Sequence, residues 1–362
     1  MPLPLKIGIL CGGTGAEHGV DLLAVKDVVN GLSSLGHLTK IIYIAKSGIW
    51  YQVDIENDEL NKKTFDVLVE EKSDKLIPVM KLISKNSADI FTVAALEPID
   101  LFFPLTDDPI QGFLDSLGTP YVGSDWVGVA VGRDKDICKR LLSSAGLPVV
   151  DGIVIDINEP VDYRSIISRL GSTLFVKPAR QGSSFGVSKV FEENGFHEAI
   201  EAAGRFDRKI IIETAIQGRE VEVAVLGDES PVVSSELGEI VDMDGYYTFE
   251  KKYFQNSERH IKVPAMIDSK LKEEMRLAGL KAFQVLGCSG MARIDFILEP
   301  GNRYYVLEVN TSPGLGIKSM YPKIWDASGL QYKELLNCLV ESALAKKTGS
   351  INVEHQLSMS NI

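Results

Sequence analysis

The sequence predicts an α/β protein whose N-terminal part is an open parallel β-sheet. Residues 6–10 are a short apolar run typical of a buried strand, and Gly12 and Gly13 follow it as a tight turn. Apolar residues then recur at helical spacing over Val20–Leu35, and a second apolar run follows at Ile41–Ile44. Strand, glycine turn, helix and strand in this order are typical of parallel sheets that bind ligands at the carboxyl ends of their strands. The glycine turn alone fits a purely structural role equally well.

The rest of the chain continues this α/β pattern over several domains. Asp100–Pro104 is predicted to be a buried strand and Pro120–Gly123 a short one, and a helix is expected from about Asp134 to Ala145. Because 362 residues exceed what one hydrophobic core usually organises, several domains are expected. The predicted parts are an N-terminal α/β domain over 1–133, a central part over 134–226, a C-terminal part over 227–350 and a loose tail over 351–362.

Composition and charge argue against several classes of protein. The net charge of −12 and the lack of a dense Lys/Arg run predict that nucleic acid is not a partner. The four cysteines form no CxxC pair, so neither a disulfide framework nor a zinc site is indicated. No signal-peptide pattern and no apolar stretch of about 18 residues is found, so no membrane association is expected. These features predict a cytoplasmic enzyme.

A glycine- and serine-rich loop is the first candidate for a ligand site. An apolar strand ends in Lys177, and the loop that follows contains Gly182, Ser183, Ser184 and Gly186. Glycines let the backbone approach an anion, serine hydroxyls donate hydrogen bonds, and the lysine supplies positive charge. The pattern predicts a loop that closes over a triphosphate. A flexible hairpin loop with an incidental lysine is the alternative.

A predicted β-hairpin over residues 292–310 carries the second candidate site. A short turn in the middle sets a register in which Arg293 lies opposite Asn310 and Asp295 opposite Glu308. Because side chains alternate with period two, these four share one face of the hairpin. The opposite face is expected to point into a core and consists of Ile294, Phe296, Leu307 and Val309.

The shared polar face predicts a divalent cation. Two carboxylates directly across a strand pair repel each other unless a cation lies between them. Asp295, Glu308 and the amide oxygen of Asn310 are ligands suited to Mg²⁺, and Arg293 could bind an oxygen on which negative charge develops. The Pro-Gly turn that ends at Gly314 adds free N–H groups, so the pattern favours acyl-phosphate chemistry. A solvated polar face with a surface salt bridge is the alternative.

Two further carboxylates are candidates for nucleotide binding. Glu213 ends an apolar strand and Glu220 lies in the alternating strand that follows. Either could bind the ribose hydroxyls of a nucleotide, and both fit equally well as solvated strand residues. None of the five histidines has metal-ligand spacing, and no Ser/His/Asp set suggests another chemistry.

In this order and at these separations, the motifs resemble the D-alanine–D-alanine ligase family of ATP-grasp enzymes. The likeness covers nearly the whole chain. The segments that carry it are Gly12–His18, Gln111–Leu114, Pro120–Ser124, Arg133–Asp136, Val176–Val190, Phe249–Tyr253, Ala292–Asp295 and Leu307–Met320.

The resemblance implies a fold and a reaction. The fold would be an ATP-grasp fold preceded by an open parallel α/β domain. The reaction would join two D-alanines to D-alanyl-D-alanine through a D-alanyl-phosphate, for peptidoglycan precursor synthesis. It would consume ATP with two Mg²⁺ ions, for which Mn²⁺ could substitute, and the enzyme would be a homodimer formed through the first domain.

The resemblance also implies roles for the nucleotide and metal residues. Lys135 and Lys177 would contact the ATP phosphates, and Glu220 would hold the ribose. The metal ions would be bound by Asp295, Glu308 and Asn310.

For the amino acids, the resemblance implies that Glu17 orients the ammonium group of the first D-alanine, within a network that includes Ser183 and Tyr253. Tyr253 favours an amine as the acceptor. The tetrahedral intermediate would be stabilised by Arg293 and the Gly314 N–H group, and the second D-alanine would lie beside Ser319 and Met320.

This chain departs from the family pattern at three places. Gly19 and Asp21 stand where the family has a glutamate and a serine, and the HGxxGEDG loop is replaced by the short run 103–112. Lys318 adds a positive charge near the expected carboxylate of the second substrate and could compensate for part of the lost loop. Two alternatives therefore stay open: a related ligase for other amino or hydroxy acids, and a catalytically silent nucleotide-binding paralogue.

Overall fold

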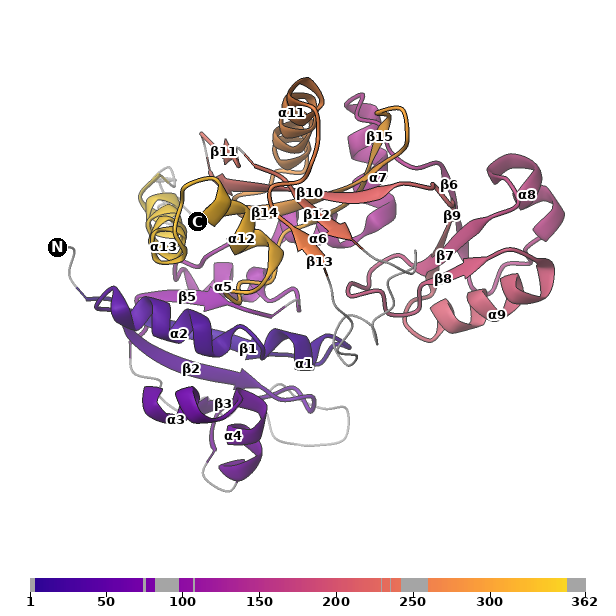
Figure 1. Ribbon diagram of the computed structural model, residues 1–362. Coiled ribbons are helices and arrows are strands. Elements are labelled where there is room, and N and C mark those ends of the chain that lie inside the picture. The colour runs from indigo at the N-terminus through magenta and orange to yellow at the C-terminus, as the bar shows by residue number, and fades with distance from the viewer. Residues whose placement is uncertain are drawn as a thin grey trace, which may run out of the picture.

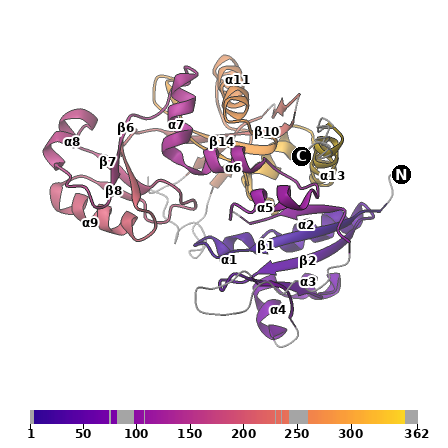
Figure 2. The same cartoon turned by 180° about the vertical axis from the view of Figure 1, so that it is seen from behind.

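Three β-sheets organise the part of the chain that the computed structural model describes, namely residues 4–73, 76–81, 98–106, 108–228, 230–234, 236–241 and 260–349. The N-terminal sheet lies at the bottom of Figure 1, a second sheet lies at the right with α8 and α9, and the third lies between α11 and the N-terminal layer. Figure 2 gives the same arrangement from behind.

The N-terminal sheet has the strand order β4-β3-β2-β1-β5. Its parallel centre confirms the predicted open α/β sheet, since β1 pairs in parallel with both β2 and β5, while β3 and β4 add antiparallel strands. The strands are β1 (Lys6–Gly12), β2 (Leu38–Ile44), β3 (Ile49–Val53), β4 (Ile77–Lys81) and β5 (Leu101–Pro104). The helices of this region are α1 (His18–Asp21), α2 (Val25–Ser34), α3 (Asn57–Lys62), α4 (Phe65–Glu71), α5 (Gln111–Leu117) and α6 (Trp126–Arg133).

Two predicted elements of this region differ in the structure. The helix predicted over Val20–Leu35 is divided, because α1 ends at Asp21 and α2 begins at Val25. The strand predicted over Pro120–Gly123 is only an isolated bridge from Tyr121 to β5. Gly123 has a φ of 102°, which turns the chain away from the sheet after that bridge.

The second sheet has the order β6-β9-β7-β8 and is antiparallel. Its own core lies between the sheet and the helices α8 and α9, and includes Val176, Phe196 and Ile212. The elements are β6 (Gly152–Asp156), α8 (Tyr163–Leu170), β7 (Leu174–Pro178), β8 (Ser188–Val190), α9 (Glu193–Gly204) and β9 (Lys209–Thr214).

The third sheet carries the predicted hairpin. Its order is β13-β12-β10-β14-β15, and β11 pairs with β10. The strands are β10 (Arg219–Gly227), β11 (Val232–Val233), β12 (Gly238–Val241), β13 (His260–Lys262), β14 (Gly290–Leu298) and β15 (Tyr304–Asn310). The helices are α7 (Lys135–Ser144), close to the predicted range, α11 (Ser269–Val285), α12 (Met320–Ala327) and α13 (Tyr332–Gly349). No helix in the described ranges is both long enough and apolar enough to cross a membrane.

The strand pairing bears on where the domains divide. β10 pairs with β14 from Arg219 to Gly227, so a boundary at 226 would separate most of β10 from its own sheet. We propose that the second boundary lies at about 215–218, between β9 and β10, and keep 133 as the proposed end of the first domain.

The first and third sheets share one core through α2 and α13. Gly31 on α2 has no room for a side chain, because a Cβ there would lie 2.3 Å from a methyl group of Leu336 on α13. Buried residues of both regions form one cluster, which includes Val28, Leu32 and Leu339. The N-terminal helix α2 is therefore held against the C-terminal part of the chain.

Candidate active site

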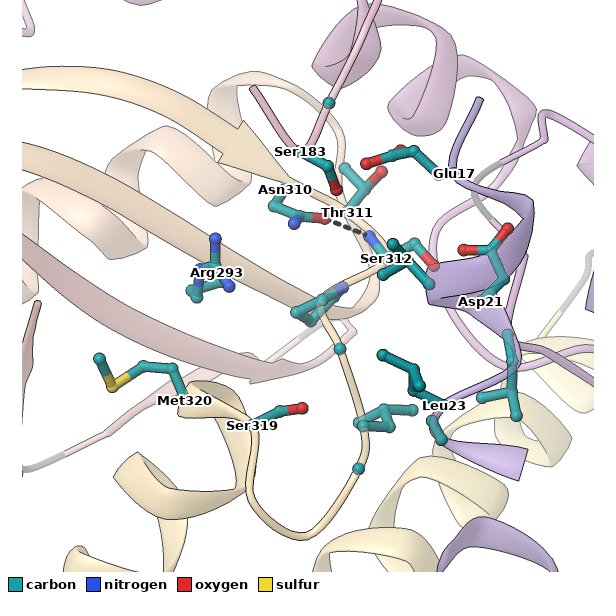
Figure 3. A pocket seen from close by; sticks show the side chains of 18 of the residues that line it. Glu17, Asp21, Leu23, Ser183, Arg293, Asn310, Thr311, Ser312, Ser319 and Met320 are labelled. Atoms are coloured by element: carbon teal, nitrogen blue, oxygen red, sulfur yellow. Dashed lines mark hydrogen bonds between the residues drawn. The ribbon is translucent and has the colours of Figure 1, made fainter. Parts of the chain in front are cut away.

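A cavity of about 640 Å³ lies between three regions of the chain. One wall comes from the segment Glu17–Asp27, a second from the loop Gln181–Ser183, and a third from Arg293 and the segment Glu308–Met320. Figure 3 shows side chains of all three regions directed toward this space. The predicted site residues that line this cavity are Glu17, Lys135, Ser183, Arg293, Glu308, Asn310, Gly314, Ser319 and Met320. The predicted residues Lys177, Ser184, Glu213, Glu220 and Asp295 are not part of its lining.

The glycine-serine loop has a strongly curved backbone. Ser183 and Ser184 have φ values of 48° and 62°. The Phe185 N–H donates to the Gly182 carbonyl at 3.1 Å and closes a turn in the loop. The ammonium group of Lys135 donates to the Gln181 carbonyl at 2.7 Å, so this lysine lies under the loop. Ser183 lines the cavity.

Glu17 meets the same loop from the N-terminal region. A Cβ added to Gly182 would lie 2.7 Å from one carboxylate oxygen of Glu17, so the carboxylate occupies the space that only a glycine leaves open. Figure 3 shows Glu17 next to Ser183. The predicted proximity of Glu17 and Ser183 therefore has a physical basis, whereas Tyr253 lies outside the described residues.

Glu213 is buried between two lysines. Its carboxylate lies 2.6 Å from the ammonium nitrogen of Lys177 and also pairs with Lys139. Although burial opposes it, the charge of the two lysines lowers the pKa of Glu213, and burial lowers the pKa of Lys139 to about 8. Lys139 was not among the predicted residues and lies one helical turn after Lys135 on α7. The nucleotide role of Glu213 stays a prediction.

The predicted hairpin register is confirmed at both polar pairs. Arg293 lies opposite Asn310, and Asp295 lies opposite Glu308. The prediction that Leu307 points into the core is wrong, because a bulge after Asp295 places Val306 opposite Phe296. Val306 is fully buried, and the core residues on this side are Ile294, Phe296, Val306 and Val309.

Arg293 is the centre of a buried charge cluster. Its Nε and Nη2 atoms donate to the two carboxylate oxygens of Asp295, both at 2.7 Å, and Nε lies 3.1 Å from Glu222. Glu222 was missed in the sequence, since its position follows from the pairing of β10 with β14, which puts it opposite Asp295. The carboxylates of Glu220, Glu222 and Asp295 all lie within 4.8 Å of one another.

The donor set suits a hard divalent cation. Burial raises the pKa of Asp295 to about 6; Arg293 opposes this shift, while Glu308 and Glu220 add to it. Carboxylates that lie close together on neighbouring strands repel one another, and a divalent cation such as Mg²⁺ relieves that repulsion. The described carboxylates close enough to share one ion are Glu220, Glu222 and Asp295, so the set Asp295, Glu308 and Asn310 stays a prediction. Glu308 also lies 3.3 Å from the ammonium nitrogen of Lys135, which links this site to the glycine-serine loop.

The segment after β15, residues 311–319, completes the cavity. Asn310 accepts a hydrogen bond from the Ser312 N–H group at 3.0 Å, as Figure 3 shows. The Ser319 N–H donates to the Gly316 carbonyl at 2.7 Å, and a Cβ on Gly314 would lie 3.1 Å from the Ser319 hydroxyl. The turn thus brings the predicted residues Gly314 and Ser319 together. Met320 follows at the start of α12 and is buried.

The shortened connection after β5 packs against the glycine turn. Asp108 accepts hydrogen bonds from the backbone N–H and the hydroxyl of Thr14, at 2.6 and 3.3 Å. Leu105 lines the cavity. An apolar residue thus belongs to the cavity wall at the place where the missing family loop would begin.

Comparison with known proteins gives matches over nearly the whole chain. A family model described as D-ala D-ala ligase N-terminus matches residues 6–124, and one described as D-ala D-ala ligase C-terminus matches residues 141–341. The D-alanine–D-alanine ligase of Oceanobacillus iheyensis is 37% identical over 351 residues, which cover 94% of this chain and 95% of that protein.

Solved structures agree with these matches. The D-alanine–D-alanine ligase from Coxiella burnetii gives a TM-score of 0.80 at 32% identity and covers 95% of this chain and 96% of its own. The VanG D-Ala:D-Ser ligase from Enterococcus faecalis gives a TM-score of 0.79 at 30% identity, with coverage of 94% and 100%. The predicted ATP-grasp fold and family are confirmed, and the chain belongs to the D-alanine–D-alanine ligase family.

Proposed function

We propose that this protein joins two D-alanines to D-alanyl-D-alanine at the expense of ATP. The observation that carries the proposal is the cavity of about 640 Å³ whose walls are Glu17, the Gln181–Ser183 loop, Arg293 and the Glu308–Met320 segment. A carboxylate for an ammonium group, a loop for phosphates and a guanidinium for an oxyanion are the three elements that ligation through an acyl-phosphate requires.

The chain's own residues would divide the work as follows. Lys135, Lys177 and the Gln181–Ser184 loop would hold the ATP phosphates, Glu213 would pair with Lys177, and Glu220 would bind the ribose. Mg²⁺, held by Asp295, Glu308 and Asn310, would neutralise charge on the transferred phosphoryl group.

For the amino acids, Glu17 and Ser183, joined by Tyr253, would orient the first D-alanine so that its carboxylate oxygen attacks the γ-phosphorus and ADP leaves. The neutral amine of the second D-alanine would then attack the acyl carbon and expel phosphate, and the proton that the nitrogen loses would leave with the phosphate. Arg293 and the Gly314 N–H group would stabilise the oxyanion, and Ser319 and Met320 would hold the second substrate.

An altered second substrate is the alternative that specific features favour. Leu105 and Lys318 line the cavity beside a connection that lacks the HGxxGEDG pattern, and a D-Ala:D-Ser ligase is among the similar structures. An additional cation near the acceptor carboxylate, together with a changed wall, would alter which amino or hydroxy acid is joined.

The deciding experiment measures phosphate release from Mg·ATP with D-alanine, with L-alanine and with no amino acid, and identifies the product by mass. Release that requires D-alanine and gives the dipeptide supports the proposal. Release that requires D-serine or D-lactate supports the altered substrate. Tight ATP binding without release under any amino or hydroxy acid would favour the silent paralogue.

Gly182→Ala is expected to weaken use of the first D-alanine. The new methyl group would occupy the position 2.7 Å from a Glu17 oxygen, so the carboxylate or the loop has to shift. A displaced orienting group lowers kcat/KM for D-alanine by about 10- to 100-fold. Steady-state kinetics measure this. The control is Gly195→Ala on α9, where a Cβ meets nothing within 4 Å; equal kinetics for both variants would contradict the prediction.

We also propose a homodimer formed through the first domain and an action in the cytoplasm. The support for the dimer is an apolar surface on α5 and α6, where Trp126 is 57% exposed and Leu117 50%. Phe113 and Val127 extend it. Large apolar side chains exposed on two neighbouring helices are typical of association surfaces.

Trp126→Glu is therefore expected to dissociate the dimer, because a carboxylate would be buried unpaired in the interface. Sedimentation equilibrium would give the monomer mass for this variant. The matched control is Leu277→Glu, which changes a 56% exposed leucine on α11 and should leave the mass unchanged. Monomeric wild-type protein at micromolar concentration would contradict the dimer.

A further inference from the structure

The loop between β15 and α12 is held by two residues that lie outside the proposed catalytic set, and one of them, Asp27, also lines the cavity. The carboxylate of Asp27 on α2 accepts a hydrogen bond from the Ile317 N–H group at 2.8 Å. The phenol of Tyr332 on α13 donates to the Leu315 carbonyl at 2.9 Å. The two hydrogen bonds hold the backbone of the loop at Leu315 and Ile317, two residues apart.

The loop runs close beside α2 at Gly316. A Cβ added to Gly316 would lie 3.5 Å from Asp27 and 3.9 Å from the Cα atom of Ala24, so the backbone passes directly over the helix. The held backbone flanks the turn in which the Ser319 N–H donates to the Gly316 carbonyl at 2.7 Å. Ile317 lies within this turn, so its hydrogen bond to Asp27 holds the segment that brings Ser319 near Gly314.

Both contacts are suited to a fixed position. Asp27 is half-buried and anionic, and a hydrogen bond from a neutral N–H to a carboxylate is roughly twice as strong as one between neutral groups. Burial, and then the charge of Asp27, raise the pKa of Tyr332, so its hydroxyl stays a donor at neutral pH. Helix α2 itself is fixed, because Gly31 allows it to pack closely against Leu336 of α13.

We propose that Asp27 is a positioning residue for the second substrate, which holds the loop 313–319 so that the Gly314 N–H group and the Ser319 hydroxyl face the acceptor. Asp27 lies ten residues after Glu17. One N-terminal segment would therefore carry both the group that orients the first amino acid and the residue that positions the loop for the second amino acid. This inference rests on the proposed function of the cavity.

The test compares Asp27→Ala, Asp27→Asn and Asn30→Ala. Asp27→Ala should raise the KM for the second D-alanine about ten-fold, as expected for loss of a charge-assisted hydrogen bond, and leave the KM for ATP within about two-fold. Asp27→Asn keeps an oxygen acceptor and should recover part of the loss. Asn30 lies one turn further along α2 and bonds Asn61 instead, so Asn30→Ala should behave as wild type.

A second measurement does not depend on activity. Hydrogen exchange of a peptide that covers the loop should be faster at the Ile317 amide in Asp27→Ala and unchanged in Asn30→Ala. Tyr332→Phe should loosen the same loop independently. An Asp27→Ala variant with wild-type exchange and wild-type KM overturns the inference. Wild-type protein that releases no phosphate with D-alanine overturns the proposed function instead, while faster exchange in Asp27→Ala would still support the anchor.

Discussion

Asp295→Asn is expected to lower kcat for D-alanine-dependent phosphate release by about 100- to 1,000-fold. The substitution keeps the shape of the side chain but removes a charge from the face that Asp295 shares with Glu308 across the strand pair. A neutral amide is a weaker ligand for a hard cation, so the variant should also need a higher Mg²⁺ concentration for half-maximal rate. Rates measured over a Mg²⁺ titration test both effects.

The control for this variant lies on the same hairpin. Glu299 pairs with Arg303 at the exposed turn, away from the cavity, so Glu299→Gln should keep the wild-type rate and Mg²⁺ requirement. Because Asp295 forms a buried bidentate pair with Arg293, Asp295→Asn should also lower the melting temperature, so the rates are to be compared at a temperature where both proteins are folded. Asp295→Asn with near wild-type kcat at low Mg²⁺ would remove Asp295 from the proposed metal site.

The sequence predicted local features of the site well because they depend on short-range rules. The register of the hairpin follows from a short turn and a period of two, which is why the pairs Arg293–Asn310 and Asp295–Glu308 were found. The same rule failed at Leu307, since one extra residue in a bulge exchanges the faces beyond it and has no clear mark in the sequence.

Long-range pairings account for what the sequence analysis missed. Glu222 joins the charge cluster only because β10 pairs with β14, more than sixty residues later in the chain. Likewise, the contact between Asp27 and Ile317 joins residues 290 positions apart. Alternation shows which side of a strand a residue occupies, but not which other strand lies beside it.

The resemblance to a known family supplied the roles that physical reasoning from single residues left open. Glu17 has no distinguishing pattern in its own segment, and its place against Gly182 depends on how the N-terminal sheet and the glycine-serine loop approach each other. Such an approach is a property of the whole fold. It therefore became visible only through family likeness or three-dimensional structure.

Glu213→Gln is expected to cause the largest loss of stability, about 3 kcal/mol at pH 7, because breaking a buried ion pair leaves charge without compensation. Glu213 is 2% exposed and pairs with both Lys139 and Lys177. Without its carboxylate, the two lysines would lie close together away from water with no anion between them, so one of them has to lose its proton or carry an uncompensated charge. Urea unfolding should give a clearly lower midpoint. The double variant Glu213→Gln/Lys139→Met should recover part of the loss, because one of the two buried charges is removed with its partner.

The same loss should shrink as the pH rises. Lys139 titrates at about 8 in the folded chain, below the ordinary lysine value of 10.5, so above pH 8 the unfolded chain binds more protons and this group adds stability as the pH increases. Loss of Glu213 removes a negative charge beside Lys139 and lowers its folded pKa further. At pH 7 Lys139 is therefore charged in the folded wild type and largely neutral in the folded variant. By pH 9 this lysine is neutral in both folded proteins, and its share of the difference disappears. The urea midpoints of variant and wild type are compared at pH 7 and at pH 9. An equal difference at both pH values would show that Glu213 does not stabilise the charged form of Lys139.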